Sequence, residues 1–150
     1  MSERIEYRCY VFVSSLLSSG SKMAQVFHAG VELCKQYLHG DNYNIGKPPA
    51  LDAVVRYANV DKTVIVLDGG NNRTMNELCY TLRELSDELA LPMSYFYEDE
   101  DTLNKMLTSI AIIVPSTIYD NKLQNPSTLL QAPHHETKLA AILQTHYLAR

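Results

Sequence analysis

The sequence predicts an α/β protein with a mixed four-stranded sheet, helices on both faces of that sheet, and an arm and a helix added at the C-terminal end. The first observation is length, because 150 residues suit one compact domain. The second is composition, because a hydrophobic fraction of 46% suffices for a buried core and argues against disorder. The third is order: apolar segments typical of strands alternate with segments of helical periodicity.

The first strand and the first helix have the clearest patterns. Residues 7–13 (YRCYVFV) are aromatic and β-branched and predict a buried strand. A loop of small residues follows at 14–21. Residues 22–38 predict a helix, and turn-rich residues 40–49 end it. The apolar positions of this helix, spaced by three or four residues, are Met23, Val26, Phe27, Gly30, Val31, Cys34 and Leu38.

The middle of the chain predicts a helix, a strand and a second long helix. Residues 50–57 favour a short helix, and residues 63–67 (TVIVL) predict a buried strand that ends at a glycine-rich turn. Thr74 followed by Glu77 has the spacing of a capping box. We therefore expect a helix to begin there and to continue to about residue 90.

Two more strands and a different tail complete the prediction. Residues 93–97 and 109–114 predict the third and fourth strands. Residues 116–133 contain two prolines and many polar residues, which favours an extended arm. Residues 134–148 predict a final helix. Its apolar stripe consists of Leu139, Ile142, Leu143 and Tyr147.

The charge of the chain is uneven. With 17 acidic and 13 basic residues the formal net charge is −4, which argues against general binding to nucleic-acid backbones. Seven acidic and no basic residues lie between positions 84 and 101. Without that segment the chain has more basic than acidic residues, so the remainder can still attract an anion.

The compartment and the cofactors follow from what the sequence lacks. The longest apolar run, residues 110–115, is too short to span a bilayer, and the first residues have no apolar segment typical of a secretory signal. Three cysteines, Cys9, Cys34 and Cys79, fit neither a disulfide framework nor a zinc motif and are expected in the core. We expect a cytoplasmic protein with no membrane partner, no cofactor and no metal.

Two junctions between a strand and a helix are candidate ligand sites. In open α/β sheets, ligands bind at the carboxyl ends of strands, where loops meet helix N-termini that favour phosphate or carboxylate. These junctions are residues 14–22 and 68–74, both rich in small side chains. Neither has the spacing of a P-loop or of a dinucleotide-binding turn. The alternative is that both are ordinary turns with helix caps.

His28 lies six residues after Lys22 on the first predicted helix. A neutral histidine near the start of a helix can act as a general base or hydrogen-bond a ligand. The alternative is a histidine that packs against the sheet with its ring nitrogens satisfied.

Residues 10–37 resemble the first strand, loop and helix of type II peptidyl-tRNA hydrolases. Four helix residues, Ala24, Gln25, His28 and Ala29, match that family's pattern. Residues 63–97 are similar to its second strand, helix and third strand, and residues 110–115 to its last strand. The resemblance covers about residues 7–115 and implies a mixed four-stranded sheet flanked by helices.

This resemblance implies an ester hydrolase that releases the peptide from peptidyl-tRNA. A histidine or a carboxylate would activate water, and a lysine would balance phosphate or oxyanion charge. The implied catalytic residues are His28, Lys22, Asp99 and Thr102. Glu98 and Thr102 have the family's spacing of acid and threonine, whereas Asp99 offers a carboxylate without that spacing.

The basic loop of the family is replaced here by serines. Ser18, Ser19, Gly20 and Ser21 stand where the family has Gly-Lys-Gly-Lys, and Lys22 is one position out of register. Because tRNA needs several cations for its phosphates, we favour a diverged protein that binds a small nucleotide-like or anionic ligand without hydrolysing tRNA, with sequestration of that ligand as one role. The residues expected to bind it are Ser18, Ser19, Gly20, Ser21, Lys22, Gln25 and His28. An active peptidyl-tRNA hydrolase is the alternative.

The C-terminal segment suggests a homo-oligomer. We divide the chain into an α/β domain, residues 1–115, and an arm and helix, residues 116–150. The apolar stripe of the last helix must be covered, either by the domain itself or by a partner subunit. A homodimer or a higher homo-oligomer is therefore expected, together with either ligand hypothesis.

Overall fold

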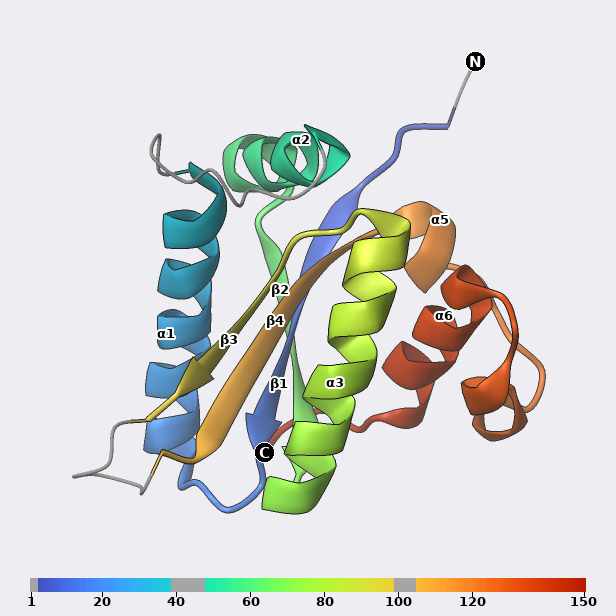
Figure 1. Ribbon diagram of the computed structural model, residues 1–150. Helices are drawn as coiled ribbons and strands as arrows, with labels where there is room; N and C mark the ends of the chain where they lie inside the picture. The colour runs from blue at the N-terminus through green and yellow to red at the C-terminus, as the bar shows by residue number, and fades with distance from the viewer. Residues whose placement is uncertain (1–2, 39–47, 99–104) are drawn as a thin grey trace.

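The computed structural model describes residues 3–38, 48–98 and 105–150, which form one sheet covered by helices (Figure 1). The strands are β1 (Tyr7–Ser14), β2 (Thr63–Gly70), β3 (Met93–Tyr97) and β4 (Leu107–Pro115). The α-helices are α1 (Ser19–Leu38), α2 (Pro48–Arg56), α3 (Asn72–Leu89), α5 (Ser116–Tyr119) and α6 (His135–Thr145). A π-helical turn (Tyr57–Asp61) and a 3₁₀ helix (Pro126–Gln131) complete the description.

The strands lie in the order β2-β1-β4-β3. β1 is parallel to β2 and antiparallel to β4, and β3 is antiparallel to β4. The parallel pair arises because α1 and α2 carry the chain from the end of β1 back to the start of β2. The prediction of an α/β protein with a mixed four-stranded sheet is confirmed.

Each face of the sheet has its own core, because alternate residues of a strand point to opposite faces. Phe12 belongs to the cluster under α3 and α6, together with Leu82 and Leu139. Val11 and Val13 belong to the cluster under α1 and α2. Helices therefore cover both faces, and β1 and β4 contribute to both cores.

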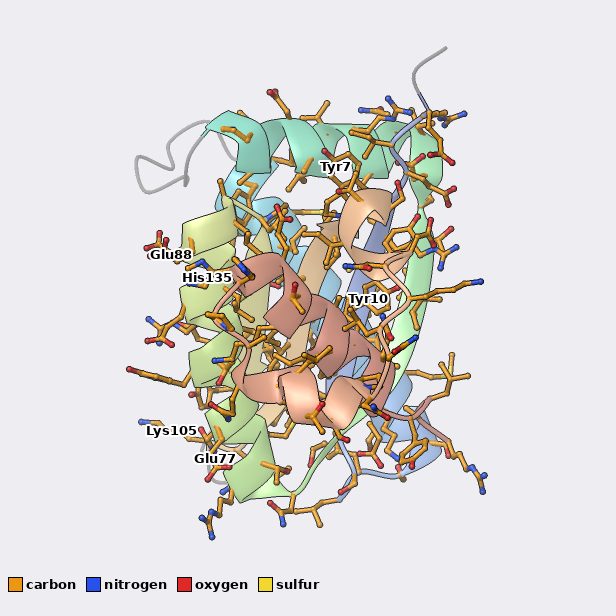
Figure 2. The ribbon with its side chains drawn as sticks, turned by 90° about the vertical axis from the view of Figure 1, so that its right-hand side faces the viewer. Tyr7, Tyr10, Glu77, Glu88, Lys105 and His135 are labelled. Carbon is orange, nitrogen blue, oxygen red and sulfur yellow. The ribbon has the colours of Figure 1, made fainter. Side chains whose placement is uncertain are left out.

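Helix α6 packs on its own domain. Leu139, Ile142 and Leu143 are buried in the same cluster as Phe12, whereas Tyr147, the last residue of the predicted stripe, is 85% exposed. Figure 2 shows α6 over this face of the sheet. The segment 116–133, expected to be an extended arm, is partly helical: α5 and the 3₁₀ helix lie within it. The C-terminal segment is thus part of the domain core.

The residues after α6 cover the outer edge of β2. Leu148 forms an antiparallel bridge with Leu67. The N–H of Asp68 donates to the carbonyl of Tyr147 at 2.8 Å, and the N–H of Ala149 donates to the carbonyl of Val66 at 3.0 Å. This segment satisfies main-chain groups that an edge strand would otherwise present to solvent.

Two local expectations were wrong. The N-cap of α3 is Asn71, whose side chain accepts from the N–H of Thr74, so Thr74 lies inside the helix that it was expected to cap. Cys34, expected in the core, is exposed. The apolar positions that predicted α1 are also mostly exposed, and the helix buries Gln25, Ala29, Leu33 and Tyr37 instead.

No helix among the described residues is long and apolar enough to cross a membrane.

Candidate functional site

The two predicted junctions lie side by side at the carboxyl ends of β1 and β2. The N–H of Ser15 donates to the carbonyl of Gly70 at 2.8 Å, which joins the two loops. In the second junction, Gly70 has a φ of +85°, and a Cβ at Gly69 would collide with the sulfur of Met75. The glycines of this junction therefore serve a tight turn and the close packing of α3.

In the first junction, serines cap α1. The hydroxyl of Ser18 accepts from the N–H of Ser21 at 3.3 Å and donates to the Ser21 hydroxyl at 3.0 Å. A Cβ at Gly20 would meet nothing within 4 Å. Ser18 and Ser21 are therefore engaged with each other, and Ser19 is the member of this group that lines a cavity.

A cavity of about 380 Å³ lies between the start of α1 and the segment that covers β2. Lys22 and Arg150 are among its lining residues, and the Nζ of Lys22 donates to the main-chain oxygen of Arg150 at 3.1 Å. The other described lining residues are Ser19, Met23, Val26, Val66 and Ala149. Apolar walls beside a helix N-terminus, with a lysine and an arginine in the lining, suit an anion with an apolar body.

Gln25 faces β3 and β4 rather than the cavity. The amide of Gln25 donates to Oε2 of Glu98 at 2.7 Å, and its Oε1 accepts from the hydroxyl of Thr108 at 2.7 Å. Because Gln25 is 5% exposed and Thr108 is fully buried, these bonds tie α1 to β3 and β4 inside the protein.

His28 is half-buried at the edge of this network. Its Nδ1 lies 3.4 Å from Oε1 of Gln25, and its ring centroid lies 4.6 Å from that of Phe96. A histidine beside a buried amide can act as a general base or hydrogen-bond a ligand. It can equally serve as packing against Phe96, which was the alternative left open by the sequence.

The residues expected to form one site are therefore divided between two sides of α1. Lys22 and Ser19 face the cavity beside β2, whereas Gln25 and His28 face β3 and β4. The expected catalytic residues Asp99 and Thr102 lie outside the described residues.

Arg150 and Thr108 were not singled out from the sequence. Arg150 is 128 positions from Lys22, and Thr108 is 83 positions from Gln25. No local pattern indicates such contacts. The spacing of Glu98 did draw attention to that carboxylate, but not to its bond with Gln25.

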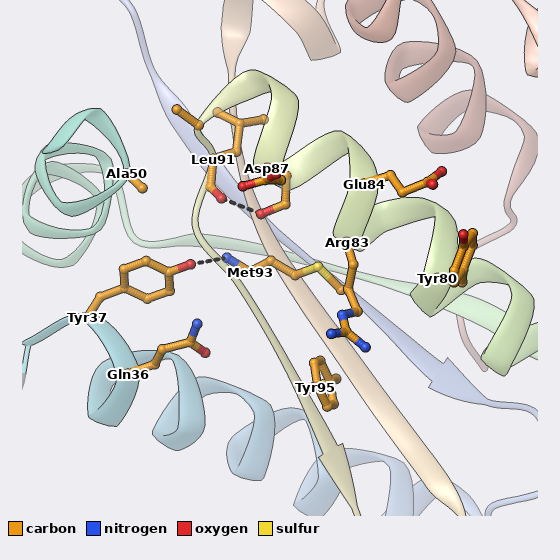
Figure 3. A pocket seen from close by; sticks show the side chains of 12 residues that line it. Gln36, Tyr37, Ala50, Tyr80, Arg83, Glu84, Asp87, Leu91, Met93 and Tyr95 are labelled. Atoms are coloured by element: carbon orange, nitrogen blue, oxygen red, sulfur yellow. Dashed lines mark hydrogen bonds between the residues drawn. The ribbon is translucent and has the colours of Figure 1, made fainter. Parts of the chain in front are cut away.

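A larger groove of about 580 Å³ lies beside β3, between α1 and α3 (Figure 3). The hydroxyl of Tyr37 meets the N–H of Met93 there at 3.3 Å, and Arg83 lies over the ring of Tyr95 at 5.4 Å. Of the residues expected to bind ligand or to catalyse, none that the structure describes lines this groove. Within residues 3–38, 48–98 and 105–150, no group of three or more His, Cys, Asp or Glu side chains is arranged to hold a metal ion.

Comparison with protein-family models and with curated proteins gives no match for this chain.

Proposed function

We propose that the protein binds a small anionic, nucleotide-like ligand in the cavity beside Lys22 and Arg150, without hydrolysing tRNA. The observation that carries this proposal is a cavity with apolar walls at the N-terminus of a 20-residue helix, with Lys22 and Arg150 among its lining residues. The phosphate lies at the helix N-terminus and contacts Lys22 and Arg150. The base and sugar pack on Val26 and Val66.

The size of the positive surface favours a small ligand over tRNA. Two of the described lining residues are cationic, which suffices for one or two phosphates. A tRNA substrate makes many phosphate contacts, and each one needs a cation or another donor. The protein acts in the cytoplasm in this proposal, which agrees with its three free cysteines.

Thermal unfolding with a panel of ligands tests the proposal. The panel contains AMP, ADP, 3′,5′-cyclic AMP and a cyclic dinucleotide, with adenosine as the uncharged comparison and inorganic phosphate as the bare anion. A ligand at 100 times its Kd adds about 2.7 kcal/mol to folding stability, which raises Tm by roughly 5–10 °C for a chain of this size.

Variants then locate the site. Lys22→Ala and Arg150→Ala each weaken binding by about tenfold or more, because each removes a charge-assisted contact to phosphate. Lys122→Ala, at an exposed lysine away from the cavity, leaves the affinity unchanged. Ligands that fail to raise Tm, or a binding affinity insensitive to Lys22→Ala, contradict the proposal.

The second candidate function is hydrolysis of peptidyl-tRNA on a diverged type II peptidyl-tRNA hydrolase fold. The favouring observation is that the amide of Gln25, in the segment that resembles the family's helix, holds the carboxylate of Glu98 near His28. In this function His28 or Glu98 takes a proton from the attacking water, and Lys22, on the other side of α1, balances a phosphate of the tRNA.

A release assay with a peptidyl-tRNA analogue tests this second function. If the protein hydrolyses peptidyl-tRNA, the wild type releases peptide above background, and release falls by about a hundredfold or more in His28→Ala or in Glu98→Gln. Equal release by the wild type and both variants contradicts it. Ligand binding at Lys22 and Arg150 without turnover supports the first function alone.

A further inference from the structure

Helix α1 has an exposed apolar stripe along its outer side. Met23 is 76% exposed and Phe27 is 71% exposed, and Val31 and Leu38 are each nearly half exposed. Cys34 is exposed between them. The stripe follows one side of the helix because its members are spaced by three, four or seven positions. Figure 1 shows α1 along one side of the molecule, with its length parallel to the sheet.

Such a stripe is unusual on a monomer. Single exposed apolar residues are common, but a contiguous row with two large side chains mostly in solvent marks a contact surface. The opposite side of α1 is already used, because Ala29 and Leu33 pack on the sheet. The stripe is therefore not needed for the core of this chain.

We infer that this stripe, defined as Met23, Phe27, Gly30, Val31, Cys34 and Leu38, is the contact between two copies of this chain. The two α1 helices pack antiparallel about a two-fold axis that passes between Gly30 and Val31. The sequence of the stripe is self-complementary about that point. The axis places Met23 opposite the second copy's Leu38, Phe27 opposite its Cys34, and Val31 opposite its Gly30.

Side-chain size supports this register. In each of the two central pairs, a larger residue faces a smaller one: phenylalanine faces cysteine, and valine faces glycine. A Cβ at Gly30 would meet nothing within 4 Å, so the space beside Gly30 is open to a side chain from outside. Interlocking of large and small residues is how helices approach closely.

Charge also favours a second copy as the occupant. The stripe contains no charged side chain, although the chain as a whole has a net charge of −4. Glu32 and Lys35, beside the stripe, form an ion pair with each other at 3.8 Å. Two acidic molecules can therefore meet at this face without bringing an excess of like charge together, as an isologous interface requires.

The alternative surface for a dimer, the apolar stripe of α6, is already occupied. Leu139, Ile142 and Leu143 are buried under their own chain. We therefore assign the contact of the expected homo-oligomer to α1 and not to the C-terminal helix.

Sedimentation equilibrium across a range of protein concentrations tests the inference. The wild type is expected to associate to twice the mass of the chain. Phe27→Glu raises the dissociation constant by at least tenfold, because it places a carboxylate opposite the apolar contact. The matched control is Tyr80→Glu, at a tyrosine on α3 that is 67% exposed, and it leaves the dissociation constant unchanged. Far-UV circular dichroism establishes that both variants are folded.

Cysteine cross-linking tests the register independently. Phe27→Cys places a thiol opposite the second copy's Cys34, so mild oxidation yields a covalent dimer. The double variant Phe27→Cys/Cys34→Ala does not cross-link in this register, and neither does Tyr80→Cys. A wild type that stays monomeric at every concentration overturns the inference, and so does a dimer that survives Phe27→Glu. Equal cross-linking with and without Cys34 overturns the antiparallel arrangement.

Discussion

The side-chain amide of Gln25 donates a 2.7 Å hydrogen bond to the carboxylate of Glu98, and this bond joins α1 to the residue after β3. The oxygen of this amide accepts a hydrogen bond from the hydroxyl of Thr108, so one glutamine connects three segments. Because Gln25 is almost fully buried, its polar atoms have little access to water and depend on these partners.

Replacement of Gln25 by leucine should destabilise the protein by about 1–3 kcal/mol, because it removes the donor to Glu98 and the 2.7 Å bond from the buried Thr108 hydroxyl, which keeps only the Phe96 carbonyl at 3.3 Å. Urea unfolding followed by circular dichroism measures the change. The matched control is Gln124→Leu, at an exposed position, with an expected change within about 0.5 kcal/mol. A loss for Gln25→Leu no larger than that of the control means that the network does not stabilise the fold.

Gly70→Ala should be destabilising, by about 1–3 kcal/mol, for two reasons. Gly70 has a φ of +85°, which residues with a Cβ rarely adopt, and the added carbon would collide with the hydroxyl of Thr74. Gly20→Ala is the control, because its Cβ meets nothing within 4 Å in the first turn of α1. It should be neutral or stabilising by up to about 1 kcal/mol. Equal urea midpoints for Gly70→Ala and Gly20→Ala would show that the backbone at position 70 does not require glycine.

Leu139→Ala tests whether α6 belongs to the core of the α/β domain. Leu139 is fully buried in the cluster that contains Phe12 and Leu82. Its truncation should cost about 2–5 kcal/mol and shift a single unfolding transition, as expected for one cooperative unit. Leu148→Ala, at a leucine that is 67% exposed, should change stability by less than about 0.5 kcal/mol. An early separate transition in Leu139→Ala would show that residues 116–150 unfold as a separate unit.

The sheet was predictable because its signals are local. The segment around Tyr10 and Phe12 is β-branched and aromatic, and both sides of it are buried, so its strand assignment needs no tertiary information. The order of strands and helices follows from such segments. The start of α3 was displaced by three residues because Asn71 and Thr74 are both good cap residues, and the backbone at Asn71 decides between them.

The candidate site was predictable only in part. Helical periodicity places Lys22 and His28 on one helix, but it does not say which neighbours each will meet. Lys22 meets Arg150, and His28 meets Phe96. The same limit explains the error over Cys34. Apolar periodicity shows that a helix has an apolar stripe, whereas the structure buries the side that contains Gln25 and Ala29 and exposes the stripe.

Stability should fall at alkaline pH partly through Cys9. Burial raises the pKa of the Cys9 thiol to about 12, whereas the thiol of an unfolded chain has a pKa of about 8.5. Because the pKa of Cys9 is higher in the folded protein than in the unfolded chain, the stability that the protonated thiol contributes is fully present below about pH 8.5. It is lost as the pH rises toward 12, because the unfolded chain releases the proton first. Over that range the Cys9 thiol lowers the free energy of unfolding by up to about 1.4 kcal/mol per pH unit.

Urea unfolding at a series of pH values measures this dependence, and Cys9→Ala supplies the comparison. The variant should be less stable at neutral pH, because it removes a buried side chain, but its stability should fall less steeply above pH 8.5. The buried tyrosines retain their own alkaline effect in both proteins, since burial also raises the pKa of Tyr37. The difference between the two slopes therefore reports Cys9 together with the part of the raised pKa of Tyr57 that the Cys9 thiolate causes. Parallel slopes for the wild type and Cys9→Ala would show that the Cys9 thiol ionises as readily in the folded protein as in the unfolded chain.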